Sequence, residues 1–299
     1  MASLLEVRTR IATVTTTKQI TSAMKLVSST KLFKNQRTLN NLKPFTASLF
    51  NMVKDIYRNL HADEAHKITL PAKGNKVLIV TVGSNKGLCG TYNVMLIRKT
   101  LNHIQILEKS GLEVHLLFVG SKIADFFLKN EIRVHSIQND IIENVNYDTC
   151  SELANKLIAL YIDESYSRID FVYSKFRHAL IQEFVAEQLL PLTSLPKPLQ
   201  EPKTPDDFNQ EDIFKVILEP DRKEISDYLI PKYFRTLLFQ LFLNAAASEH
   251  GARMAAMQKS TDNATELLKA LSLTMNKVRQ SMITREIMEI VSGAESMKQ

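Results

Sequence analysis

The chain has 299 residues, of which 44% are apolar, 23% charged and 7% aromatic, and its formal net charge is +6. This composition is typical of a folded globular protein, and the length allows one large domain or two smaller ones. No segment has the 18 consecutive apolar residues of an ordinary transmembrane helix. The two cysteines, Cys89 and Cys150, are too few for a disulfide framework and lack zinc-site spacing, so we expect a reducing compartment.

The positive charge is concentrated in the first sixty residues. These contain ten Lys or Arg residues and two acidic residues, and no acidic residue occurs between Val7 and Lys54. On charge alone, such a segment favours an anionic partner, whether protein, nucleic acid or membrane surface. An organelle transit peptide is the alternative, but the basic stretch merges into a helical pattern without a small-residue cleavage site.

The first sixty residues are predicted to form one long helix. Apolar residues recur at steps of three and four, and their stripe is narrow, as in a coiled-coil seam. Pro44 is expected to kink or interrupt the helix. The stripe consists of Leu4, Val7, Ile11 and Val14 and, after a polar break, of Ile20, Met24 and Val27.

The middle of the chain has the pattern of an α/β domain. After a linker, β-branched runs alternate with amphipathic segments, which indicates a largely parallel sheet covered by helices. Strands are expected at 76–82, 113–119, 132–137, 168–176, 181–185 and 213–218, and helices at 91–108, 121–129 and 151–164.

A helical pattern returns at residue 221 and continues almost to the end. Neither terminal helix could bury so narrow a seam alone, so we expect the two to pair as a long antiparallel coiled coil projecting from an inserted Rossmann-like α/β domain. The predicted domains are 1–60, 61–220 and 221–299. The heptad signal is clearest at Leu268, Leu271, Met275, Val278 and Met282.

The last helix contains a run of small residues between 245 and 257. One interpretation is close packing between helices, because small side chains let backbones approach. The other is a slender rod that fits within another surface.

The best candidate for chemistry is the loop Gly83–Gly90 after the first strand. A glycine-rich loop between a strand and a helix can cradle phosphate, but its spacing fits neither the Walker nor the dinucleotide pattern. A tight turn with positive φ is the favoured interpretation. Cys89 in this loop lacks a neighbouring base, and the seven scattered histidines show no metal-binding pair. His115 and His135 are expected to be structural residues on strands.

Binding to nucleic acid stays open on charge alone. Residues 1–32 lack aromatic side chains on which bases could stack, and the basic residues are spread around the helix rather than gathered on one face.

Four segments resemble the gamma subunit of F-type ATP synthases. ITSAMKLVSSTKLFKNQ at 20–36 is similar to the N-terminal helix of that family, and residues 248–295 are similar to its C-terminal helix. GSNKGLCGTYN at 83–93 resembles the loop after the first strand, and EFVAEQLLPL at 183–192 resembles a further segment. The resemblance covers nearly the whole chain.

The resemblance implies a rotor shaft without a catalytic site and without a bound cofactor. Its expected partners are the alpha and beta subunits, the epsilon subunit and the c-ring, with one copy of the shaft per complex. Ion flow would turn ring and shaft, and the asymmetric shaft would drive conformational change in the beta subunits. The expected location is peripheral, on the cytoplasmic face of the bacterial inner membrane, with the mitochondrial matrix side as the alternative.

The family pattern also implies contacts with the hexamer of alpha and beta subunits, although for Met24 a place in the seam is an equal alternative. The alanine-rich stretch would fit the bore of that hexamer. The implied contact residues are Met24, Lys25, Arg279, Gln280, Thr284 and Glu286.

The chain departs from the family pattern at Asn85, where Asp is usual, at Thr91, where Gly is common, and at Gly251, where Ala is usual. The competing hypotheses are an α/β enzyme or nucleotide-binding protein with coiled-coil arms, supported by the glycine loop, and a basic coiled-coil protein that binds nucleic acid.

Overall fold

The computed structural model describes residues 4–58, 65–129, 134–138, 140–178, 181–192 and 221–296. The chain forms two compact units. One contains residues 30–252, and the other joins residues 1–29 to residues 253–299. None of the described helices is long and apolar enough to cross a membrane.

The unit of residues 30–252 is built on a five-stranded sheet of order β3-β2-β1-β4-β5. The first four strands are parallel, and β5 runs antiparallel to β4. This topology confirms the predicted Rossmann-like domain; the strand expected at 213–218 lies outside the described residues. The strands are β1 (Lys76–Val82), β2 (Glu113–Val119), β3 (Val134–Gln138), β4 (Arg168–His178) and β5 (Ile181–Leu190).

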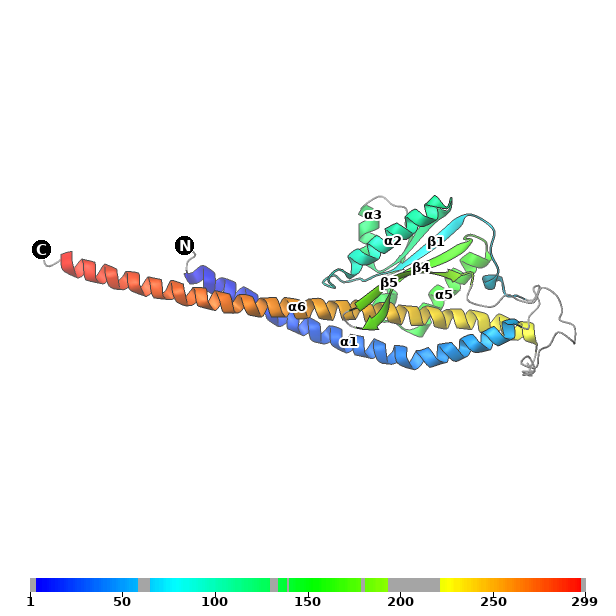
Figure 1. Cartoon of the computed structure of the whole chain (residues 1–299), viewed down its shortest axis with the longest axis horizontal. Coiled ribbons are helices and arrows are strands. Elements are labelled where there is room, and N and C mark those ends of the chain that lie inside the picture. The colour runs from blue at the N-terminus through cyan, green and yellow to red at the C-terminus, as the bar shows by residue number, and fades with distance from the viewer. Residues whose placement is uncertain are drawn as a thin grey trace. The chain divides into compact units, whose positions relative to one another are not determined.

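Helices cover both faces of this sheet (Figure 1). On one face lie α2 (Tyr92–Lys109) and α3 (Ser121–Lys129). The other face carries α4 (Asp140–Glu143), α5 (Tyr147–Ile162) and parts of the two terminal helices. This double cover explains the unbroken β-branched run of β1, where every residue after the first is buried.

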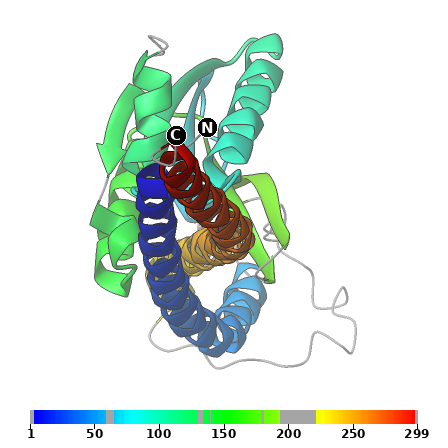
Figure 2. The same cartoon turned by 90° about the vertical axis from the view of Figure 1, so that its left-hand side faces the viewer.

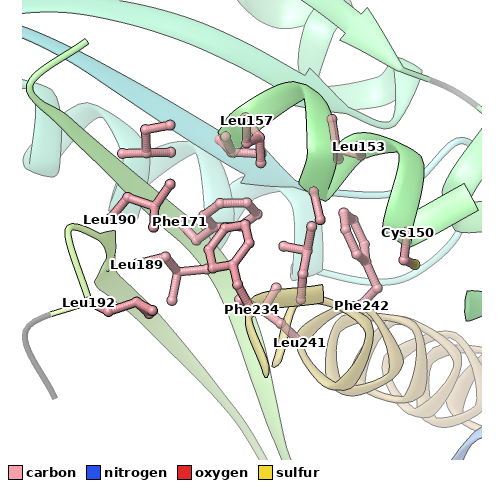
Figure 3. Packing of buried hydrophobic residues seen from close by; sticks show 14 of the residues in the cluster. Cys150, Leu153, Leu157, Phe171, Leu189, Leu190, Leu192, Phe234, Leu241 and Phe242 are labelled. Carbon is pink, nitrogen blue, oxygen red and sulfur yellow. The ribbon is translucent and has the colours of Figure 1, made fainter. Parts of the chain in front are cut away.

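The core on the second face joins three layers of structure (Figure 3). Phe171 on β4 lies between Leu157 of α5 and Phe234 of α6, and all three side chains are fully buried. The N-terminal helix contributes Val53 and Tyr57 to the same cluster. The terminal helices are therefore part of the folded core within this unit.

Each terminal helix is continuous. The first helix, α1, spans Leu4–Arg58, and the last, α6, spans Arg222–Ser296. A kink or an interruption was expected at Pro44; the interruption is wrong, because α1 continues through this proline. The turns on either side are anchored by the buried side chains of Leu39 and Thr46, and their packing offsets the roughly 3 kcal/mol that an interior proline costs.

The unit of residues 1–29 and 253–299 is a pair of antiparallel helices, with the N- and C-terminal ends on the same side (Figure 2). The hydroxyls of Thr21 and Thr261 lie 2.9 Å apart and share a hydrogen bond across the pair. Counting from this contact places Val14 at the level of Leu268. The predicted coiled coil of the two termini is therefore confirmed.

The small-residue run of α6 is used for close packing. Ala245, Ala246 and Ala247 are buried within the unit of residues 30–252, and Ser248 donates a hydrogen bond of 3.2 Å to the carbonyl of Ser174 on β4. The expectation that this stretch fits a bore is wrong for these residues, since the sheet domain covers them. Gly251 is buried as well.

Candidate interaction surface

The seam of α1 follows one heptad phase from its first turn to residue 32, but its middle is polar. Ile20 and Val27, which were expected to continue the apolar stripe, are 55% and 57% exposed. That prediction is wrong, because the 3–4 spacing set by the first turns continues through polar side chains. The buried and half-buried seam positions are Leu4, Val7, Ile11, Val14, Lys18, Thr21, Met24, Lys25, Ser28 and Leu32.

The polar part of the seam satisfies its hydroxyls within its own helix. Ser28 donates to the carbonyl of Met24 at 2.8 Å, and Thr21 is within bonding distance of the carbonyl of Lys18. Lys18 and Lys25 are half-buried, and in the described part of the chain neither forms an ion pair. This stretch of the pair therefore holds two lysines that are not ion-paired within the described residues.

Apolar side chains of α1 instead face outward. Leu5 and Leu26 are 74% and 70% exposed, and Phe33, a few residues after Leu26, is 64% exposed. Exposed large apolar groups at helical spacing favour an interaction surface. Sequence reasoning missed these residues, although keeping the heptad phase of Val7 and Val14 would have placed them on the outer face.

The predicted contact residues fall into two separate groups. Met24 and Lys25 are half-buried in the seam, at about the level of Gln258. Arg279 is 21 residues beyond Gln258, about 30 Å along the helix at 1.5 Å per residue. The second group, all exposed, is Arg279, Gln280, Thr284 and Glu286.

The end of α6 passes beyond the first turn of α1. By the register of the pair, Leu4 lies near Val278, so the later residues have no counterpart in the described part of α1. All residues from 279 to 293 are exposed, and the Thr284 hydroxyl donates a hydrogen bond of 2.9 Å to the carbonyl of Gln280. The exposed apolar side chains are Met282 (45%), Ile283 (47%), Ile287 (54%), Met288 (65%), Ile290 (70%) and Val291 (54%).

The glycine loop after β1 is explained by close packing. A Cβ on Gly83 would lie 2.2 Å from Cδ1 of Ile123, and one on Gly120 would lie 2.8 Å from the backbone of Gly83. Two backbone segments thus approach each other at the carboxyl ends of β1 and β2. Gly90 has a φ of +62°, which the favoured turn interpretation expected.

At the start of α2, where a phosphate would bind in a nucleotide-binding sheet, the side chain of the first helical residue is buried against α6. Tyr92 is 1% exposed, and its hydroxyl donates to the carbonyl of Ala245 at 3.2 Å. In the same loop Ser84 bonds to Asn93, whose amide lies 3.4 Å from the sulfur of Cys89. These contacts give Ser84, Asn93 and Cys89 structural partners.

Two buried ionisable groups of the sheet domain have structural roles. Asp170 is fully buried, with His103 Nε2 at 2.7 Å and Arg168 Nε at 2.6 Å from its two oxygens. Burial raises the pKa of Cys150 to about 12, which leaves its thiol protonated and unreactive. In the described ranges, no three His, Cys, Asp or Glu side chains are grouped to hold a metal ion.

The fold defines a class of protein in which an α/β domain is carried between two paired terminal helices. The chain matches the family described as ATP synthase over residues 3–297. It is 38% identical to the ATP synthase gamma chain of Christiangramia forsetii over 99% of each chain. The gamma chain of Flavobacterium psychrophilum is also 38% identical over the full length of both.

Solved structures share the fold. A chain of the Euglena gracilis mitochondrial ATP synthase (OSCP/F1/c-ring) aligns with a TM-score of 0.64 and 19% identity, covering 98% of this chain and 94% of that one. A chain of the Tetrahymena thermophila central stalk and c-ring aligns with a TM-score of 0.57 and 23% identity, covering 80% and 98%. The protein therefore belongs to the ATP synthase gamma chain family.

Proposed function

We propose that this chain is the central rotor shaft of an F-type ATP synthase and has no catalytic site of its own. Its paired helices turn inside a hexamer of alpha and beta subunits, and its sheet domain joins the epsilon subunit and the c-ring. It binds no nucleotide or other cofactor. It lies peripherally at the cytoplasmic face of the bacterial inner membrane, with the mitochondrial matrix side as the alternative.

The observation that carries this proposal is the exposed apolar end of α6. Six large apolar side chains between residues 282 and 291 are 45–70% exposed, and the charged Arg285, Glu286 and Glu289 lie among them. Large apolar side chains exposed in this number mark a surface that another protein covers. A sleeve of alpha and beta subunits supplies that cover.

The contact residues have different parts in this proposal. Arg279 presents a planar, charged donor suited to a carboxylate of a beta subunit, and Gln280, Thr284 and Glu286 lie beside it on the exposed end. Met24 and Lys25 act from the seam, close to the outward Leu26. Coupling requires that each orientation of this uneven surface favours a different set of beta conformations.

The test is assembly of the purified full-length chain with purified alpha and beta subunits. We expect a complex that contains one copy of the chain and hydrolyses ATP at several cooperating sites. A folded chain that neither assembles nor changes hydrolysis would contradict the proposal. Micromolar nucleotide binding by the isolated chain would instead support an enzyme built on the glycine loop.

A further inference from the structure

A short 3₁₀ turn, η2 (Lys67–Thr69), is held by two other helices in the unit of residues 30–252. Tyr57 near the end of α1 donates its hydroxyl to Thr69 Oγ1 at 2.7 Å. Tyr161 on α5 donates to the carbonyl of Leu70 at 2.6 Å. The turn therefore ties the end of α1 to the helix layer of the sheet domain.

The same turn also receives the end of β5. The backbone N–H of Leu192 donates to the carbonyl of Ile68 at 3.0 Å, and the Ile68 side chain is fully buried in the core. Three elements thus depend on the geometry of three residues. A change in the backbone geometry of η2 would therefore alter the contacts of α1, α5 and β5 together.

The turn is capped by a histidine ring. Nδ1 of His66 accepts a hydrogen bond of 3.3 Å from the backbone N–H of Ile68. An imidazole nitrogen accepts a hydrogen bond only when it carries no proton, so this cap exists only while His66 is neutral. Burial of the ring lowers the pKa of His66, which agrees with a neutral ring at neutral pH.

A second partner is available to the charged ring. Asp227, in the second turn of α6, attracts the protonated form of His66 and acts against the effect of burial. The other titratable groups beside the turn are Tyr57 and Tyr161, and burial raises the pKa of both, so they stay neutral here. The end of β5 contributes apolar residues, and Lys67 of the turn is exposed.

We propose that protonation of His66 weakens the junction of η2 with α1, α5 and β5. The neutral ring caps η2, whereas the protonated ring leaves the Ile68 N–H for Asp227 and loosens these contacts. The unfolded chain binds this proton more readily than the folded chain, because the pKa of His66 is lowered from 6.5. Stability from the neutral ring is therefore complete above that pH and decreases as the pH falls below it.

The test uses His66→Asn in the full-length chain, because the asparagine side-chain oxygen can accept the same backbone hydrogen bond without titrating. Amide hydrogen exchange of the segment containing Ile68 is measured at pH 7.5 and 5.5, with wild type and variant compared at the same pH. We expect similar exchange at pH 7.5 and at least about fivefold faster exchange of the wild type at pH 5.5, the effect of one hydrogen bond.

Two further variants complete the test. Asp227→Asn removes the attraction for the charged ring, so faster exchange should begin at a lower pH than in the wild type. His178→Asn, a change at an exposed histidine, should leave the exchange of Ile68 unaltered. Equal exchange of the wild type and His66→Asn at both pH values would refute control of the junction by His66 protonation. A difference in exchange that does not change with pH would refute it as well.

Discussion

The two halves of α1 share one helix and one heptad phase, yet they are stabilised differently. Between residues 30 and 58, seam positions such as Leu39 and Val53 are each 1% exposed, and the last turns enter the core of the sheet domain. Between residues 4 and 29, the middle seam positions are polar, and apolar Ile20 and Leu26 face outward. Residues 30–58 gain stability by burying their apolar side chains, whereas residues 4–29 leave several of theirs exposed.

This difference separates folding from assembly along a single helix. Burial of a leucine side chain stabilises a protein by about 1.5–3 kcal/mol, so a helix that exposes Leu26 forgoes this gain until a partner covers it. A helix whose middle seam positions are polar and whose outward side chains include exposed apolar residues is suited to further contacts with other protein. Residues 30–58 thus contribute to folding, whereas residues 4–29 leave an apolar surface for a partner.

The largest expected effect on stability comes from a substitution in the buried half of α1, residues 30–58. Leu39→Ala should lower the free energy of unfolding by about 2–5 kcal/mol, because it leaves a cavity at a side chain that is 1% exposed. Leu26→Ala is the matched control on the same helix and should change stability by less than about 0.5 kcal/mol. Urea unfolding followed by circular dichroism measures both. Equal effects of the two variants would refute the contrast between the halves.

Much of the fold could be predicted because local pattern and tertiary packing agree there. The strands β1 and β2 have the predicted limits, since both are rich in apolar residues and each is buried over its last four residues. The prediction failed where packing overrides composition. Ile20 and Val27 of α1 were assigned to the seam but face outward. For the alanine run of α6, the close-packing interpretation is confirmed, and the fit to a bore is wrong where the sheet domain covers it.

The candidate contact residues were reached from the sequence by resemblance, and packing adds a distinction that the sequence did not contain. Met24 and Lys25 are half-buried in the seam, whereas Arg279 and Gln280 are exposed. Exposure depends on where α1 begins relative to α6, which is a property of the pair's register. No pattern within either helix alone specifies that register.

A smaller effect is expected from the hydrogen bond in the polar seam. Thr21→Val alone should lower stability by about 0.5–1.5 kcal/mol, because it removes the partner of Thr261. The double variant with Thr261→Val should recover most of that loss, since two matched apolar groups replace two matched hydroxyls. A double-mutant cycle by urea unfolding measures the coupling. Strictly additive losses would show that the bond does not couple the helices.

The smallest effect on folding and the clearest effect on function are expected at the exposed end of α6. Arg279→Ala should change the stability of the free chain by less than about 0.5 kcal/mol, because its side chain is exposed. In the assembled complex it should lower coupled ATP turnover, since a charge-assisted bond to a beta subunit would be lost. Lys277→Ala is the control, two residues earlier and also exposed. Unchanged coupling by Arg279→Ala in a complete complex would show that this arginine is not part of the contact surface. The contact would then depend on the apolar side chains at the end of α6.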